Sequence, residues 1–375
     1  MIIGLAPMDG FTDCAFRQIV KEIFEVYGEK NKFELMLRTE FMNADGYIIN
    51  PPWVIKHLLT DTYQSPVIAQ IFWGNEDMLM KCFADINKKY FCNSEFKMQN
   101  AEKNKKKSDN SEFPSFEDKW ILNSTFSWIE LNIGCPARNV MHTWWGSALL
   151  QDKKHTLDII KKLSWTINMP FSIKTRTGID TNDKKNQIEF LKEVSTYVSM
   201  ITIHGRTVKQ AYTGNVDREF MYELKNKVNK HCKIIGNGGI KSYEEIERRC
   251  KWNGPKDFTL DGIMIGQAAI GNPRIFTPHI PSREEIKDIV LRHLDYMISY
   301  ENYFQKEKFT GILTMPSSDI IWHHLEKSSA IIISEFRKHL FQYVKWIPWS
   351  KEFKQKVATI VDYDQLVEEI QKFFV

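Results

Sequence analysis

Eight short apolar or β-branched runs, most of them followed by helix-like sequence, predict an α/β protein whose parallel sheet closes into a (β/α)8 TIM barrel. Each run ends in a Gly, Pro or polar cluster, and the runs are continuous apolar stretches, as is typical of strands covered on both faces. Beyond Pro278 and Pro281 the short runs give way to helical spacing. This change predicts a small C-terminal helical-bundle domain after the barrel.

The strands are expected near residues 2–6, 34–38, 66–72, 128–133, 170–174, 198–203, 232–236 and 260–265. An open doubly wound sheet is the structural alternative, although such a sheet usually needs fewer strands. No G-x-G-x-x-G follows the first run, which argues against a dinucleotide-binding Rossmann domain. We therefore predict a barrel domain over residues 1–278 and a helical domain over residues 282–375.

Two further regions complete the order of elements. Residues 93–119 are polar and lack an apolar face, so they are expected to form an insertion before the fourth strand. Its lysines could touch RNA, but acidic residues balance them, and a solvated loop is the preferred interpretation. In the C-terminal domain, helical spacing predicts about four helices, over Glu284–Tyr303, Ile320–Val344, Lys351–Thr359 and Tyr363–Phe374.

Composition limits the class of protein. The 375 residues are 43% hydrophobic and 26% charged, which is an ordinary globular balance. A net charge of +4 neither proves nor excludes a nucleic-acid partner. The six cysteines lack CxxC pairs, so reduced thiols in a cytoplasmic protein are expected, with no zinc cluster and no disulfide framework. No apolar run approaches the roughly 20 residues of a membrane span, so a membrane is not an expected partner. The cysteine spacing gives no reason to expect a metal. A monomer is the default expectation.

The most informative single feature is a cysteine at the end of the fourth run. Ile129 to Ile133 is an apolar run, and Gly134-Cys135-Pro136 stops it abruptly. The sequence thus holds a thiol at the mouth of a strand, where α/β enzymes keep their chemistry. The alternative is a packed structural cysteine, because free cysteine is among the most buried residue types.

Polar residues at the ends of the other runs indicate what this thiol would meet. Glycines after strands seven and eight would let backbone N–H groups approach a phosphate. His204 and Lys174 could add positive charge or hydrogen bonds to an electron-rich ring. Together these residues predict a flavin or a phosphorylated ligand at one rim of the barrel. In strand order, the residues expected to line this rim are Ala6-Pro7-Met8, Arg38-Thr39-Glu40, Gln70, Asn132 with Cys135, Lys174 with Arg176, His204-Gly205-Arg206, Asn237-Gly238-Gly239 and Gly266-Gln267.

Five ordered motifs resemble those of the tRNA-dihydrouridine synthases, and the chain is most similar to the bacterial B-type. The motifs are Ala6-Pro7-Met8-Asp9-Gly10-Phe11-Thr12-Asp13, Asn132-Ile133-Gly134-Cys135-Pro136 through Gly146-Ser147-Ala148-Leu149-Leu150-Gln151, Ile173-Lys174-Thr175-Arg176-Thr177-Gly178, Ile203-His204-Gly205-Arg206-Thr207, and Met264-Ile265-Gly266 through Gly271-Asn272-Pro273. The resemblance covers the barrel apart from the insertion. It continues more weakly through Phe336-Arg337-Lys338-His339.

The resemblance implies an FMN-dependent enzyme that reduces the C5–C6 double bond of particular uridines in tRNA, with NADPH as electron donor. In that family, reduced flavin gives hydride to C6 and the cysteine of the Gly-Cys-Pro loop, here Cys135, protonates C5. A thiol of pKa about 8.5 is protonated near neutral pH and can act as an acid. The family pattern places around FMN the residues Ala6, Pro7, Met8, Gln70, Lys174, His204, Asn237, Gly239, Gly266 and Gln267, and near the uracil and flavin Asn132 and Arg176.

A tRNA substrate requires further contacts, because the target base must leave its stack to reach a barrel mouth. Arg337, Lys338 and His339 lie in a span, residues 335–356, with a local excess of positive charge. Phosphate contact is the functional interpretation of this span, and a solvated helix face is the alternative.

The chain departs from the family pattern at four places. Asn139 stands where the family commonly has Lys, with Arg138 beside it as a substitute cation for the substrate. Trp144-Trp145 replace smaller residues in the same loop, Gln267 stands where Arg is frequent, and Gly239 stands where Asp is frequent. Two alternatives therefore stay open: a divergent non-catalytic tRNA-binding protein, and another FMN barrel oxidoreductase.

Overall fold

The computed structural model describes residues 1–90, 126–134, 146–250, 259–310 and 318–375. Eight parallel strands follow one another around a closed barrel in sequence order. This arrangement confirms the predicted (β/α)8 barrel. The strands are β1 (Ile2–Leu5), β2 (Glu34–Asn43), β3 (Val67–Phe72), β4 (Trp128–Asn132), β5 (Phe171–Arg176), β6 (Met200–His204), β7 (Lys233–Asn237) and β8 (Gly262–Ile265).

Seven strands agree with the expected runs to within three residues, and β2 does not. The polar residues Arg38, Thr39 and Glu40 were expected to follow the second strand, but β2 continues through them to Asn43. The register against β3 shifts between Arg38 and Phe41. All three polar side chains are buried, so they remain in the strand because they find polar partners inside the protein rather than solvent.

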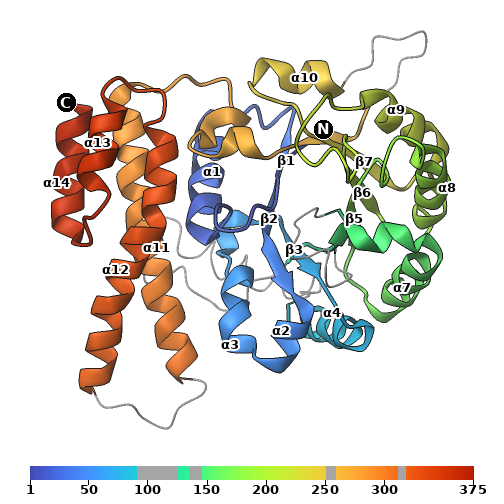
Figure 1. The fold of residues 1–375 in the computed structure, drawn as a ribbon, viewed down its shortest axis with the longest axis horizontal. Coiled ribbons are helices and arrows are strands. Elements are labelled where there is room, and N and C mark those ends of the chain that lie inside the picture. The colour runs from blue at the N-terminus through green and yellow to red at the C-terminus, as the bar shows by residue number, and fades with distance from the viewer. Residues whose placement is uncertain (91–125, 135–145, 251–258, 311–317) are drawn as a thin grey trace, which may run out of the picture. The chain divides into compact units, whose positions relative to one another are not determined.

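Helices and 3₁₀ turns connect the strands, and α4, α7, α8, α9 and α10 surround the barrel (Figure 1). After β2 come α2 (Ala44–Ile49), α3 (Pro51–Val54), η1 (Ile55–Leu58) and η2 (Thr62–Gln64). The remaining connections contain α4 (Glu76–Tyr90), η4 (Gly146–Gln151), α7 (Lys153–Thr166), α8 (Lys184–Val194), α9 (Arg218–Lys227) and α10 (Glu244–Cys250).

Part of the barrel interior is apolar. Buried side chains from several strands pack together there, which removes them from water and stabilises the closed sheet. Half-buried Trp128 packs against this cluster, whose members are Ile2, Ala6, Met36, Ile68, Met200, Ile235 and Met264.

The chain divides into two compact groups of residues. The first contains Met1–Asp9 and Phe33–Ile265, and the second contains Gly10–Lys32 and Gly266–Val375. Helix α1 (Cys14–Tyr27) therefore belongs to the second unit, where it packs against α11 (Arg283–Thr310). These units are groups of residues that pack together, and they do not test which residues form the catalytic and the tRNA-binding domain. The domain limits 1–278 and 282–375 therefore remain a prediction.

The second unit also contains the four helices that the spacing predicted. Besides α11 they are α12 (Ser318–Tyr343), α13 (Ser350–Val357) and α14 (Tyr363–Phe374), preceded by η5 (Gln267–Ala269) and η6 (Pro273–Phe276). Helices α11 and α12 lie side by side (Figure 1). Among the described residues, no helix combines the length and the apolar character needed to cross a membrane.

Candidate active site at the strand ends

The strand ends bring several of the predicted site residues to one rim of the first unit. Asn132, Arg176, His204 and Asn237 are the last residues of four successive strands. Arg176 pairs laterally with His204, and His204 pairs with Asn237. Lys174, two residues before the end of β5, pairs with Asn132. Parallel register therefore gathers side chains that lie far apart in the sequence.

A buried ion pair inside the barrel supports this rim. The carboxylate of Glu130 accepts hydrogen bonds from Nε of Arg38 at 3.0 Å and from Nη2 at 3.2 Å. Both side chains are fully buried, at 0% exposure. Gly4 leaves room for the guanidinium, because a Cβ at that position would lie 3.0 Å from Nη1 of Arg38. The sequence analysis placed Arg38 on the rim and did not select Glu130. A charged residue within each of two apolar strands was the sign in the sequence that could have indicated a buried ion pair.

A line of hydrogen bonds continues from Glu130 to the loop that carries the cysteine. Gln70 donates from Nε2 to Oε1 of Glu130 at 2.6 Å, and its Oε1 accepts from Nδ2 of Asn132 at 3.0 Å. Oδ1 of Asn132 in turn accepts from the backbone N–H of Gly134 at 3.0 Å. Gln70 and Asn132 are thus oriented from within the barrel, and they fix the backbone immediately before Cys135.

Arg176 holds the same backbone from the other side. Its Nε donates to the carbonyl oxygen of Gly134 at 2.8 Å, and its Nη1 donates to those of Thr207 at 3.0 Å and Ala211 at 2.6 Å. Its guanidinium also lies 5.5 Å from the ring centroid of Tyr212. These contacts join the loop after β4 to the loop after β6, so Arg176 positions backbone at the site.

His204 is a neutral histidine surrounded by cations. Burial, together with the nearby charges of Lys174, Arg176 and Arg206, lowers its pKa to about 2. Nη1 of Arg206 lies 3.2 Å from Nε2 of His204. Because a guanidinium can only donate, Nε2 accepts and the ring proton belongs on Nδ1.

The residues of this rim have the properties that a phosphate-bearing cofactor requires. Three cations come close enough to depress the pKa of His204, so the local field favours an anion. After β7, Gly238 and Gly239 have φ values of +107° and +74°. A Cβ on Gly238 would lie 2.8 Å from Cδ2 of His204, so only glycine leaves backbone accessible beside this ring. An anionic group therefore suits this part of the rim in charge, and the glycine turn leaves backbone N–H groups beside it.

Other predicted cofactor residues of the first unit follow β1. Ala6 is buried and donates its backbone N–H to the carbonyl oxygen of Ile265 at 2.8 Å. Pro7 and Met8 are half-buried. Asn237 donates from Nδ2 to the carbonyl oxygen of Met264 at 2.9 Å, which ties the ends of β7 and β8 together.

A second polar cluster in the first unit escaped the sequence reasoning. Asp9, Glu40 and His57 each offer one ligand-type atom, and these atoms lie within 4.8 Å of one another. Nδ1 of His57 lies 3.5 Å from Oε2 of Glu40, and interaction with that carboxylate raises the pKa of His57. In the sequence, the one sign of this cluster was Glu40, because a charged residue within an apolar strand needs a polar partner.

The second unit contains the remaining predicted residues that the structure describes. Gly266 and exposed Gln267 begin η5. Arg337 donates from Nη1 to the carbonyl oxygen of Ile360 at 2.5 Å, and Nζ of Lys338 lies 5.8 Å from the ring centroid of Phe11. His339 is fully buried, at 0% exposure. Its side chain thus belongs to the interior of the unit and is not offered to RNA phosphates.

Several predictions fall outside the described residues. These are the catalytic assignment of Cys135, the substrate contact of Arg138, the substitutions Asn139 and Trp144-Trp145, and the insertion over residues 93–119. They stay predictions.

Comparison with known proteins agrees with the strand-end motifs. Residues 119–375 match the family model described as dihydrouridine synthase (Dus). A probable tRNA-dihydrouridine synthase of Rickettsia typhi is 28% identical over 257 residues, which cover 66% of this chain and 68% of that protein. The tRNA-dihydrouridine synthase B of Pseudomonas aeruginosa is 24% identical over 371 residues, which cover 99% of this chain and 92% of that protein.

Among solved structures, a mandelate oxidase aligns over 70% of this chain and 64% of the oxidase chain, at 11% identity and a TM-score of 0.36. This similarity is too low to add to the argument for the fold. The family model by contrast spans well over half of the chain and includes the Gly-Cys-Pro sequence and the ends of β4 to β8. On this match the chain belongs to the dihydrouridine synthase family.

Proposed function

We propose that this protein reduces particular uridines in tRNA to 5,6-dihydrouridine, using FMN that NADPH re-reduces. The observation that carries the proposal is the rim on which Asn132, Lys174, Arg176 and His204 lie together in a member of the dihydrouridine synthase family. The relatives in Rickettsia typhi and Pseudomonas aeruginosa, named as tRNA-dihydrouridine synthases, support the same substrate.

In the proposed site the strand-end residues of the barrel would hold FMN. FMN, when bound in its reduced form, would supply the hydride for C6 of the uracil. The glycines after β7 and β8 would present backbone N–H groups to the phosphate. Lys174 would add positive charge beside the flavin ring, and His204, neutral at physiological pH, offers its Nδ1 proton as a hydrogen-bond donor. The full set proposed for FMN is Ala6, Pro7, Met8, Gln70, Lys174, His204, Asn237, Gly239, Gly266 and Gln267.

Cys135 is the proposed proton donor to C5. A thiol with an ordinary pKa near 8.5 carries its proton at neutral pH, so it can act as a general acid. The hydrogen bonds of Asn132 and Arg176 to the N–H and C=O of Gly134 support this role, because they fix the residue before the thiol. Asn132, Arg138 and Arg176 are the proposed neighbours of the uracil.

The proposed substrate, tRNA, also needs contacts to its backbone. Lys338, Lys345, Lys351 and Lys354 form no ion pair with any carboxylate in the described part of the chain, so their charges are available to phosphates. Arg337 and Lys338 remain the proposed contacts from the helical domain over 282–375. We take the enzyme to act as a monomer in the cytoplasm, where tRNA is found.

The experiment that tests the function compares purified wild type with Cys135→Ala. We expect both proteins to be yellow with bound FMN, and only wild type to form dihydrouridine in tRNA taken from a strain lacking the enzyme. Cys82→Ala, which removes a buried thiol in α4, is the matched control and should retain activity. Normal turnover by Cys135→Ala would refute the acid role.

Further measurements on the purified wild type test the two alternatives, another FMN oxidoreductase and a non-catalytic tRNA-binding protein. Equal activity on free uridine and folded tRNA would favour another FMN oxidoreductase. A colourless protein that cannot be reconstituted with FMN, but binds tRNA with strong salt dependence, would favour a non-catalytic tRNA-binding protein.

A further inference from the structure

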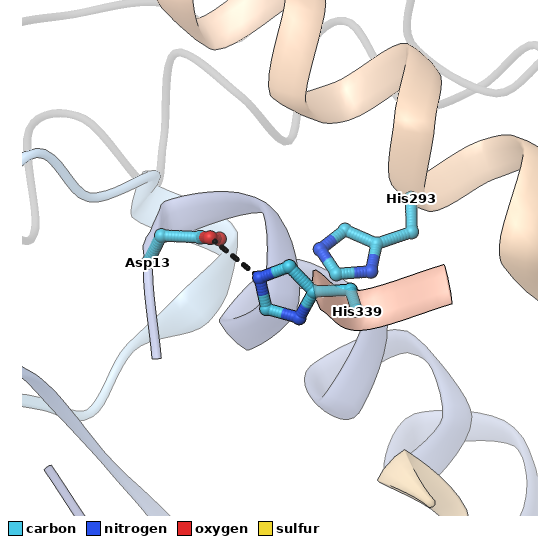
Figure 2. Close-up of side chains that lie close together, drawn as sticks. All are labelled: Asp13, His293 and His339. Carbon is cyan, nitrogen blue, oxygen red and sulfur yellow. Dashed lines mark ion pairs between the residues drawn. The ribbon is translucent and has the colours of Figure 1, made fainter. Parts of the chain in front are cut away.

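Two histidines and one aspartate meet inside the second unit. Asp13 precedes α1, His293 lies on α11 and His339 lies on α12. Nε2 of His339 lies 3.3 Å from Oδ2 of Asp13. One ligand-type atom of each residue lies within 4.8 Å of the other two. Figure 2 shows the carboxylate and both imidazoles pointing toward one another.

One ring nitrogen at this point lacks the hydrogen bond that buried polar atoms normally make. His293 and His339 are both 0% exposed. Within the described part of the chain, Nε2 of His293 is buried without a hydrogen-bond partner, and the Asp13 carboxylate lies 3.3 Å from Nε2 of His339. Most buried polar side-chain atoms in proteins are paired, so an unpaired imidazole nitrogen in a cluster with a second imidazole and a carboxylate indicates a partner that binds lone pairs.

The orientation of His293 supports this conclusion. Its Nδ1 lies 3.0 Å from the hydroxyl oxygen of Tyr343. With the ring proton on Nδ1 and donated to that oxygen, Nε2 presents its lone pair to Asp13 and His339. Histidine ligands of metals are commonly held in this way by a bond from the other ring nitrogen.

The surroundings of the cluster exclude water on most sides. The ring of Phe16 stacks on His339 at a centroid distance of 5.8 Å, and Phe11 contacts the same imidazole edge-on at 5.4 Å. Phe336 lies edge-on to His293 at 5.6 Å. Asp13 retains 23% exposure, so an ion can reach the cluster past its carboxylate.

We propose that Asp13, His293 and His339 bind a divalent transition-metal ion, with Zn²⁺ as the preferred ion. Two nitrogens and one carboxylate oxygen are a donor set that suits zinc, and a water that enters past Asp13 completes the tetrahedron. Ligands of tetrahedral zinc, with bonds of about 2.0–2.1 Å, are separated by about 3.3 Å. The Nε2–Oδ2 distance of His339 and Asp13 is 3.3 Å.

The proposed ion would join three segments that are distant in the sequence. Oδ1 of Asp13 also caps α1 by accepting from the N–H of Phe16 at 2.8 Å, so the metal would link the start of α1 to α11 and α12. The proposal is independent of the proposed function.

The test is metal binding by the full-length protein. After chelator treatment we expect wild type to take up one Zn²⁺ per chain, measured by elemental analysis and calorimetry, and to melt at a higher temperature with Zn²⁺ than without. Co²⁺ in its place should give the visible d–d bands of a tetrahedral site. His293→Gln and His339→Gln should weaken Zn²⁺ binding at least 100-fold, and Tyr343→Phe about 10- to 100-fold.

His279→Gln is the matched control, because His279 lies in the same unit, stacks on Tyr27 and is not one of the three clustered residues. This variant should bind Zn²⁺ like wild type. Wild type that takes up no stoichiometric Zn²⁺ or Co²⁺, or shows no change in melting temperature, would overturn the proposal and leave a hydrogen-bonded cluster only. Because these measurements on wild type need no variant, the test stands even where a buried substitution prevents folding.

Discussion

At the scale of single residues, the site depends on charges that are buried and paired. Arg38 and Glu130 lie inside the barrel with no exposure, and Gln70 and Asn132 take their orientation from Glu130. A buried ion pair contributes little net stability compared with apolar packing, but loss of one partner leaves an uncompensated charge. The pair therefore acts mainly to specify how the polar rim above it is arranged.

Glu130→Gln should lower the free energy of unfolding by about 3–5 kcal/mol, because Arg38 would remain buried without a counter-charge. Urea unfolding monitored by circular dichroism measures the loss. Adding Arg38→Met to Glu130→Gln removes the orphaned charge and should recover part of the stability. If the two substitutions proved simply additive, the pair would not be coupled as described.

His204 should give the protein a specific loss of stability in mild acid. Its pKa is about 2 in the folded protein and about 6.5 when unfolded. Between these values the unfolded chain binds a proton that the folded protein does not, so its contribution is complete above about pH 6.5 and decreases as pH falls. From pH 7.5 to 5.5 the loss should be about 1.4 kcal/mol.

The measurement is urea unfolding of wild type and His204→Gln at both pH values. The variant should lose about 1.4 kcal/mol less than wild type over this interval. An equal loss in the two proteins would mean that His204 is protonated in the folded state.

At the scale of elements, the turn after β7 is built around glycine. Gly238 has a φ of +107°, and a Cβ there would also meet His204. Gly214 has a φ of +72°, but a Cβ at that position would contact only Nε2 of Gln210 at 3.2 Å. The two positions share a backbone conformation that L-residues avoid and differ in what a side chain would displace.

Gly238→Ala should therefore destabilise the protein more than Gly214→Ala. We expect about 1–2 kcal/mol for Gly214→Ala from backbone conformation alone, and a larger loss for Gly238→Ala because the methyl group crowds His204. Under the proposed function, only Gly238→Ala should lose FMN, measured by flavin absorbance after gel filtration. Similar flavin retention in both variants would argue against a cofactor contact by this turn.

At the scale of the whole molecule, the second unit presents positive charge and exposed aromatic surface. Trp346 is 86% exposed, and Nζ of Lys345 lies 5.0 Å from its ring centroid. Lys345 and Lys351 form no ion pair in the described part of the chain, whereas Lys356 pairs with Glu369. Under the proposed function, the unpaired lysines are the ones that release counterions from tRNA.

Lys345→Gln and Lys351→Gln should each weaken tRNA binding and reduce the salt slope of the affinity by about one. Lys356→Gln, whose charge already has a partner, should change both quantities less. Fluorescence anisotropy with labelled tRNA over a series of salt concentrations checks this. Equal slopes in all three variants would place the tRNA contact elsewhere.

Particular residues show how far sequence alone could go. The strand containing Leu131 and the helix Tyr363–Phe374 were predictable because hydrophobic periodicity records which side of an element is buried. The positions of His204 and Asn237 at neighbouring strand ends were predictable because the parallel barrel brings all strand ends to one rim. Arg38 was misplaced because a polar residue after an apolar run is the usual sign of a strand end, and its partner Glu130 is 92 residues away.

The sequence by itself determined the (β/α)8 barrel, the C-terminal helices and the motif that places the chain in its family, because these depend on local periodicity and ordered short motifs. Tertiary structure alone decided that Arg38 pairs with Glu130, that His204 is neutral, and that His339 faces Asp13 instead of solvent. Those outcomes depend on burial and on distances between residues remote in the chain, which no local pattern encodes. Polar side chains thus acquire their roles only when packing fixes which charge lies beside which.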